Sequence, residues 1–199
     1  GAEAGKNITD GAENVAIGMQ ALSTEDGNGQ NTAVGMQALE DLNAGATGNN
    51  TAVGHIAGRR MTTGTENTLI GAAAGDAMTG ANKNVAVGKD AAGATTIGAQ
   101  NVAIGHSSLS TNTNGDKATA VGTDALLNQN PSSAGNTFNV AVGHSAGKAI
   151  TTGTLNNLVG ALAGDALTTG SENVVMGHAA LSTEDTGNRS VAIGDFSLQ

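Results

Sequence analysis

The sequence predicts an all-β fold, a parallel β-solenoid (a β-roll) of about eleven coils with a period of 17 residues. Three observations support this prediction. A pentapeptide recurs at a nearly fixed interval along the chain. Its residues alternate between two faces, as those of a short strand do. Glycine is frequent, at 31 of 199 residues, and many glycines occupy fixed places in the repeat.

The composition excludes several classes of protein. Hydrophobic residues make up 38% of the chain and aromatic residues 1%, so the large side chains that fill the core of most compact enzymes are scarce. Only 13% of residues are charged and a single proline occurs, which argues against disorder. A net charge of −9 with 8 Lys and Arg makes nucleic acid an unexpected partner. Membrane insertion is unexpected because no apolar run approaches the roughly 20 residues that a membrane helix needs. The absence of cysteine excludes disulfides and thiolate metal sites.

The pentapeptide has the pattern Asn-x-Ala-(Val/Ile)-Gly, with small variations such as ATAVG and SVAIG. Eight of the ten intervals between its closing glycines are 17 residues long, and the other two are 19 and 21. We call each interval a coil. The closing glycines are Gly18, Gly35, Gly54, Gly71, Gly88, Gly105, Gly122, Gly143, Gly160, Gly177 and Gly194.

Each pentapeptide predicts a short strand followed by a bend. In the first one, Val15 and Ile17 face one way, and Asn14 and Ala16 face the other. The glycine that follows permits a sharp bend. In most coils a second glycine lies ten residues after the first, as Gly64 does, and we expect it to form a second bend followed by a second short strand.

A compensating pattern predicts a packed interior. Some coils carry leucine four places after the closing glycine. Others have glycine there and carry a large apolar residue seven places after, which indicates one interior slot filled from either position. The first group is Leu22, Leu39, Leu109, Leu126, Leu181 and Leu198; the second is Met61, Met78, Ile150 and Leu167.

A duplication divides the chain. Residues 55–88 align without gaps to residues 144–177, and both long intervals fall in the second coil of their block. We therefore divide the sequence into a lead-in, two five-coil blocks and the start of a further coil, at residues 1–13, 14–100, 101–189 and 190–199.

Asparagine recurs at the first place of the pentapeptide. In stacked coils these side chains would form a ladder whose amides bond along the solenoid axis. Alternatively, asparagine is present only because it suits turns. The ladder residues are Asn14, Asn31, Asn50, Asn67, Asn84, Asn101, Asn139 and Asn173.

The small apolar content of each coil indicates self-assembly. One coil alone buries too little apolar surface to offset the entropy of ordering its residues. We therefore expect a strand face to pack against other copies of the chain. Three rods around a common axis, a homotrimer, are the simplest closed arrangement that buries one narrow face of each.

The segments NTAVGMQAL and NVAIGHSSL resemble repeats of phage tail fibres and of the YadA-like heads of trimeric autotransporter adhesins. The resemblance extends from about Asn14 to Gln199, and the 17-residue period is closer to the phage form. It implies a homotrimeric left-handed β-roll that serves as a segment of a virion tail fibre, outside the cell. The expected partners are further copies of the chain and a host-surface glycan or protein.

The two long coils supply candidate binding loops, because loops on a stiff shaft are suited to recognition. Equally, the extra residues are tolerated insertions without a role. The candidate residues in these segments, 40–49 and 128–138, are Glu40, Asp41, Asn43, Asn128, Asn130, Pro131 and Phe138.

No motif predicts catalysis, a cofactor or a metal. His55, His106, His144 and His178 share one place in the repeat, but no two lie in adjacent coils, so one chain cannot chelate an ion with them. Acidic STED segments lack a calcium-repeat pattern, and paired threonines are too few for a flat ice-binding array. The alternatives left open are an adhesin head, an extracellular filament assembled head to tail and, as an enzyme, a glycan depolymerase.

Overall fold

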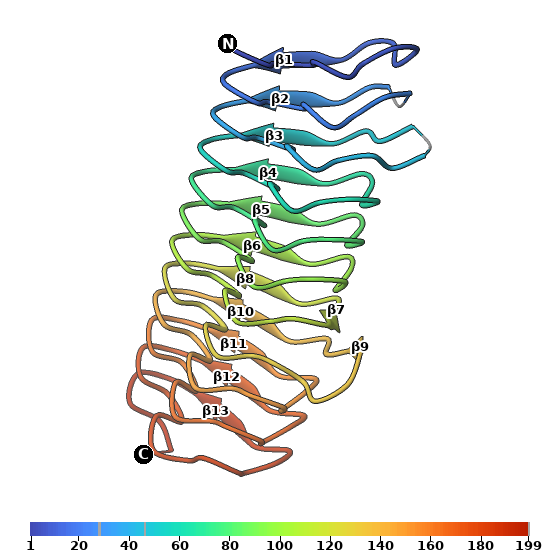
Figure 1. Cartoon of the computed structure of the whole chain (residues 1–199). Coiled ribbons are helices and arrows are strands. Elements are labelled where there is room, and N and C mark those ends of the chain that lie inside the picture. Colours follow the sequence, from blue (N-terminus) through green and yellow to red (C-terminus); the bar gives the residue numbers. More distant parts are fainter. Residues whose placement is uncertain (28, 46, 199) are drawn as a thin grey trace.

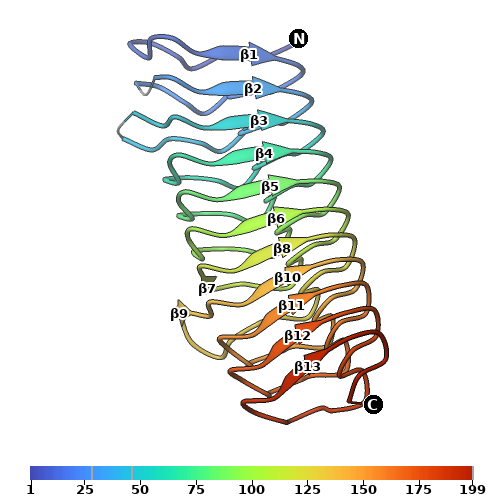
Figure 2. The same cartoon turned by 180° about the vertical axis from the view of Figure 1, so that it is seen from behind.

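The structure is a computed structural model that describes residues 1–27, 29–45 and 47–198. Eleven short strands form one parallel sheet in chain order, which confirms the predicted parallel β-solenoid. The chain winds in successive turns between termini at opposite ends (Figures 1 and 2). The strands are β1 (Val15–Ile17), β2 (Thr32–Val34), β3 (Thr51–Val53), β4 (Thr68–Ile70), β5 (Val85–Val87), β6 (Val102–Ile104), β8 (Thr119–Val121), β10 (Val140–Val142), β11 (Asn157–Val159), β12 (Val174–Met176) and β13 (Val191–Ile193).

The register of the sheet is uniform along the solenoid. Val15 pairs with Thr32, and the corresponding residues pair in every later coil. The two long coils keep this register, since β2 pairs with β3 across the 19-residue interval and β8 pairs with β10 across the 21-residue interval. The extra residues therefore leave the sheet and extend the coil elsewhere.

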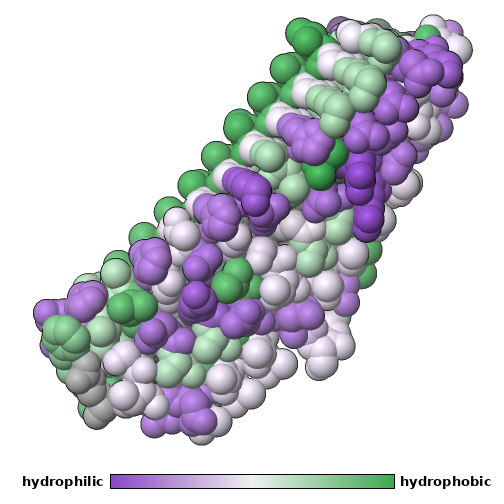
Figure 3. All heavy atoms as spheres, turned by 60° about the vertical axis from the view of Figure 1, so that its left-hand side comes forward, coloured by the Kyte–Doolittle hydropathy of each residue, from purple (hydrophilic) through white to green (hydrophobic). Residues whose placement is uncertain are grey.

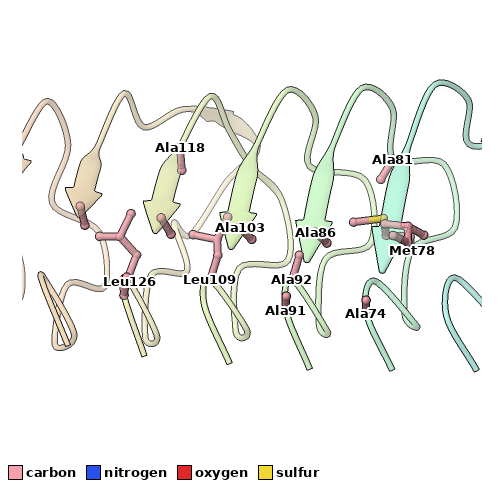
Figure 4. Close-up of a cluster of buried hydrophobic side chains, with 14 of the residues drawn as sticks. Ala74, Met78, Ala81, Ala86, Ala91, Ala92, Ala103, Leu109, Ala118 and Leu126 are labelled. Atoms are coloured by element: carbon pink, nitrogen blue, oxygen red, sulfur yellow. The ribbon is translucent and has the colours of Figure 1, made fainter. Parts of the chain in front are cut away.

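The interior is narrow and is built mainly from alanine. The middle residue of each strand points inward, and Ala33 and Ala103 are fully buried there. The predicted interior slot is also present: Leu22 and Met61 are both 0% exposed, although one stands four places and the other seven places after its glycine. Figure 4 shows Met78, Leu109 and Leu126 among the buried alanines of neighbouring coils.

The sequence pattern missed one contributor to this slot. In β4 the middle strand residue is Leu69, which fills space from the sheet side. A Cβ atom added at Gly58 would lie 2.7 Å from Leu69 Cδ1 and 2.9 Å from Leu39 Cδ2. Where the middle residue of a strand is leucine, the fourth place after the adjacent closing glycines must therefore be glycine.

The bend after each strand also requires glycine. Gly88 has φ of +134°, and a Cβ atom there would lie 2.5 Å from the carbonyl oxygen of Gly105 in the next coil. Successive bends stack backbone against backbone, which leaves no room for a side chain.

The expectation of a second strand in most coils is wrong. Among the described residues, only the pair β7 (Gly115–Asp116) and β9 (Gly135–Asn136) lies outside the main sheet. Elsewhere the chain near the second bend bonds to the next coil without forming a strand: the N–H and Oγ1 of Thr62 both donate to the carbonyl oxygen of Thr79, at 2.9 and 3.2 Å. The residue five places before the closing glycine, such as Glu66 with φ of 61°, also leaves the extended conformation.

Residues 1–13, the expected lead-in, already follow the path of a coil. The N–H of Gly5 donates to Ala21 O at 2.9 Å, and the N–H of Thr9 donates to Asp26 O at 2.8 Å. The described part of the chain contains no helix that is long and apolar enough to cross a bilayer.

Candidate functional site

The outward side of the sheet is uncharged, and one of its two rows of side chains is apolar over its whole length. Alternation in each three-residue strand turns the first and third side chains outward, and Ile104 and Ile193 remain 38% and 64% exposed. None of the eleven strands contains a charged residue. Figure 3 shows the resulting hydrophobic ridge along one edge of the rod. We call this surface the apolar strand face; its outward residues are Val15, Ile17, Thr32, Val34, Thr51, Val53, Thr68, Ile70, Val85, Val87, Val102, Ile104, Thr119, Val121, Val140, Val142, Asn157, Val159, Val174, Met176, Val191 and Ile193.

This face differs from the surface of an ordinary monomer. Eleven parallel strands at about 4.8 Å spacing give a strip about 50 Å long. Monomeric soluble proteins rarely expose a contiguous apolar patch of more than a few hundred Å², and larger patches mark sites of association. The apolar strand face is therefore a candidate contact surface.

The asparagine ladder lies at the inner edge of each strand. Asn67 is typical: its N–H and its Nδ2 donate to Asn50 Oδ1 at 3.0 and 3.1 Å, and Nδ2 also donates to the carbonyl oxygen of Ala81 at 2.8 Å. Each amide thus joins two coils and ties the strand to the opposite wall. The predicted positions share this column, and from Asn31 onward all of them are almost fully buried.

Two members of this network were not predicted from the sequence. Asn156 belongs to the column, since its N–H donates to Asn139 Oδ1 at 2.9 Å. Its pentapeptide, NNLVG, has a second asparagine in place of the usual Val or Thr, and counting back four residues from Gly160 would have found it. Where Ala118 interrupts the column, buried Gln129 supplies an acceptor, and Asn139 Nδ2 donates to Gln129 Oε1 at 2.8 Å.

Several candidate loop residues occupy regular positions of the coil. The N–H of Asp41 donates to Arg59 O at 3.0 Å, and that of Asn128 donates to Lys148 O at 3.2 Å, as in coils without insertions. Glu40 accepts a backbone bond from Thr24 in the same way.

The asparagines at the eighth place of these coils are also in register with their neighbours. Asn43 N–H donates to Thr62 O at 2.8 Å, and Asn130 N–H donates to Thr151 O at 2.9 Å. The added residues therefore follow Asn43 in one coil and Asn130 in the other. Of the first inserted segment, residue 46 lies outside the described residues.

The second insertion builds a lateral hollow. It begins at Pro131 and ends before Phe138, and it projects sideways from the solenoid beside β7 (Figures 1 and 2). We call this depression the lateral hollow; its volume is about 240 Å³, and it is lined by Pro131, Ser132, Ser133, Gly135, Asn136, Thr137, Thr152 and Thr154.

Phe138 lies next in the chain after the lining residue Thr137. Its side chain is 46% exposed, and Lys117 Nζ lies 5.4 Å from the centroid of its ring. Leu155, at the same place of the following coil, is 47% exposed. The insertion is thus followed by two exposed apolar residues, Phe138 and Leu155, on an otherwise polar side of the rod.

The described residues hold no group of three or more His, Asp and Glu arranged to bind a metal ion. The four histidines are exposed and follow the bend glycines. His178 Nδ1 lies 3.1 Å from Asp195 Oδ1, and its ring meets Phe196 edge to face at 5.0 Å.

Two aspartates have raised pKa values. Burial raises the pKa of Asp76, although Arg59 and Arg60 act in the opposite direction. Burial also raises the pKa of Asp165, against a backbone hydrogen bond and Lys148, and its Oδ1 is buried without a hydrogen-bond partner. These carboxyl groups occupy equivalent places in the two blocks, on the side wall of the coil, and their repetition indicates a property of the scaffold.

Comparison with known proteins gave no match: no family model, curated protein or solved structure is similar to this chain. The resemblance to phage tail fibres and adhesin heads therefore stays a prediction from the sequence.

Proposed function

We propose that this chain is a structural segment of a phage tail fibre, in which three copies form a stiff shaft and lateral loops attach to a host surface. The observation that carries the proposal is the apolar strand face, which is uncharged over all eleven strands. A fibre must span distance without bending, and a continuous hydrogen-bonded solenoid fulfils this requirement. The proposal places the protein on the virion, outside the cell, and assigns it no catalytic step.

The shape of the apolar strand face supports three chains. Each strand contributes two outward side chains, so the face consists of two parallel rows, such as Val85 with Val102 and Val87 with Ile104. In a closed ring of three parallel rods, each row can meet one neighbour. Every chain then uses the same face, as a closed symmetric assembly requires.

The test is the molar mass in solution, measured by light scattering. We expect three times the 19.2 kDa of one chain. The double variant Val87→Lys and Ile104→Lys should give a single-chain mass, because it places two cations in the centre of the apolar strand face. Gln100→Lys, on an exposed side wall, is the matched control and should remain trimeric.

A mass of one chain for the folded native protein would contradict the assembly, and a mass of two chains would contradict the threefold arrangement. An unchanged trimer in the double variant would show that the contact lies on another face.

A further inference from the structure

The lateral hollow is where the solenoid departs most from its repeat. The coil that contains it spans 21 residues, four more than the usual 17. The added residues pair β7 with β9, so that Gly115 lies opposite Gly135 and Asp116 opposite Asn136. The departure therefore creates a defined surface feature supported by a small sheet of its own.

Buried polar groups fix the floor of the hollow from inside. Thr137 is only 1% exposed; its Oγ1 donates to Asp116 O at 3.0 Å and lies 3.4 Å from Gln129 Nε2. Gln129 is fully buried and is held in turn by Asn139. A site whose lining is positioned by a buried network binds without first ordering its own side chains.

Strand β7, which pairs with the insertion at β9, is fixed as well. The N–H of Gly115 donates to Asn112 Oδ1 at 3.0 Å, and Asn112 Nδ2 donates to Gly115 O at 2.9 Å. Asn112 is fully buried. In the other block, the place of Asn112 in the repeat is taken by Glu25, by Thr95 or by apolar side chains such as Leu42 and Met61. Amide side chains occupy this place only at Asn112 and Gln129, in two successive coils.

The lining has a distinct chemical character. Its side chains include five hydroxyl groups, of Ser132, Ser133, Thr137, Thr152 and Thr154, and the amide of Asn136. The hydroxyl of Thr137 is bonded to Asp116 O, and none of the lining residues is charged. Hydroxyl and amide groups both donate and accept hydrogen bonds, whereas an anion needs donors and a cation needs acceptors. The hollow therefore suits a neutral ligand rich in groups that also donate and accept.

Apolar surface lies beside these polar groups. The ring of Pro131 lines the hollow, and the exposed residue Phe138 follows the lining residue Thr137 in the chain. A sugar ring has the same two-sided character, with hydroxyl groups around its rim and C–H bonds on its faces. A volume of about 240 Å³ is below the roughly 300–1,000 Å³ of sites for drug-sized ligands, so one ring of a longer chain would enter.

We propose that the lateral hollow binds one ring of a neutral saccharide chain, held by the hydroxyl and amide lining with Pro131 and Phe138 against its apolar face. This inference rests on the proposed function for its role, because it names the class of host-surface molecule that a lateral loop would contact. The site itself lies within one chain and lies away from the apolar strand face.

The test is saturation-transfer NMR on the native protein with three neutral probes, maltotriose, chitotriose and mannotriose, and one anionic probe, sialyllactose. We expect signal from at least one neutral probe and none from sialyllactose. Thr152→Val removes one lining hydroxyl, and Phe138→Leu removes the ring but keeps the residue type that Leu155 shows at this place. Each variant should weaken binding roughly two- to tenfold.

Thr63→Val is the matched control, because Thr63 is the counterpart of Thr152 in the first block and is exposed away from the hollow. It should bind the probe as the native protein does. Absence of signal from every neutral probe, stronger binding of sialyllactose, or equal binding by both hollow variants would each overturn the inference.

Light scattering on the same samples separates the two proposals. A trimer that fails to bind any neutral probe overturns the saccharide site and leaves the shaft standing. A single chain that binds a neutral probe, with loss in both hollow variants, supports the site and overturns the assembly.

Discussion

A single buried hydroxyl group, that of Thr95, marks a place where the repeat departs from its usual pattern. Thr95 stands at the seventh place after Gly88, where Met61 and Met78 fill the interior slot in the two preceding coils. Its side chain is 1% exposed, and its Oγ1 has no hydrogen-bond partner. A buried hydroxyl without a partner costs free energy that an apolar group of the same shape avoids.

Thr95→Val should therefore stabilise the protein. We expect the free energy of unfolding to rise by about 1 kcal/mol, measured by denaturant titration. Thr96→Val is the matched control, because Thr96 Oγ1 does have partners, at 3.1 Å from Thr113 O and 3.2 Å from Asn114 Oδ1. It should destabilise the protein, and a gain in both variants would show that valine is preferred at either place for another reason.

Asp165→Asn should stabilise the protein at neutral pH. Burial raises the pKa of Asp165 above the ordinary 3.8, so the folded state holds its proton more tightly than the unfolded state. Its contribution to stability consequently falls as pH rises from about 3.8 through the raised value, and the ionised group remains unfavourable above that window.

The gain from Asp165→Asn should therefore be present at pH 7, shrink as the pH falls through the raised pKa towards 3.8, and be lost below 3.8, where aspartate is protonated in both states. Thermal melting across this range measures it. Asp10→Asn, at an exposed position, corrects for the change in net charge. A gain that is the same at every pH would refute the desolvation argument.

At the scale of the element, the asparagine ladder connects the coils. Asn84 N–H and Nδ2 both donate to Asn67 Oδ1, at 3.0 and 3.2 Å, and Nδ2 also donates to Gly98 O at 2.9 Å. Its own Oδ1 accepts from the N–H of Asn101 at 2.9 Å. A three-residue strand has few ladder bonds of its own, so these side-chain bonds carry much of its attachment.

Asn84→Ala should accordingly lower the free energy of unfolding by about 3 kcal/mol, because it leaves buried groups of Asn101 and Gly98 without partners. Urea titration measures the loss. Gln100→Ala, at an exposed position, should change little. A small effect at Asn84 would favour the alternative that asparagine is there only as a turn residue.

For the whole molecule, the division between interior and outer strand face has an unusual form. The interior uses alanine with a small number of larger side chains, whereas the first and third residues of the strands, many of them branched, point outward. A thin rod has little volume to fill, so its larger apolar side chains are available for contact between chains. The same arrangement leaves the side walls free for loops such as the one that forms the lateral hollow.

Much of this architecture could be predicted from the sequence. The interval between glycines determines the stacking of coils, because a parallel sheet with constant register requires a constant repeat. The exchange between Leu22-type and Met61-type positions indicates the interior slot, since a fixed volume must be filled. These features repeat, and each can be recognised within one coil or by comparing coils.

Other features were decided only by the tertiary structure. Alternation predicted two faces of each strand, but both alanine and valine are apolar, and only the width of the folded coil decides that Ala103 points in and Ile104 points out. Gln129 completes the ladder in place of Ala118, although neither residue is near the other in the repeat pattern. The lateral hollow joins a single insertion to the next coil. Each of these contacts occurs only once, so it produces no periodic pattern in the sequence. The stacking of the coils brings the contacting segments together, and three-dimensional packing alone determines such contacts.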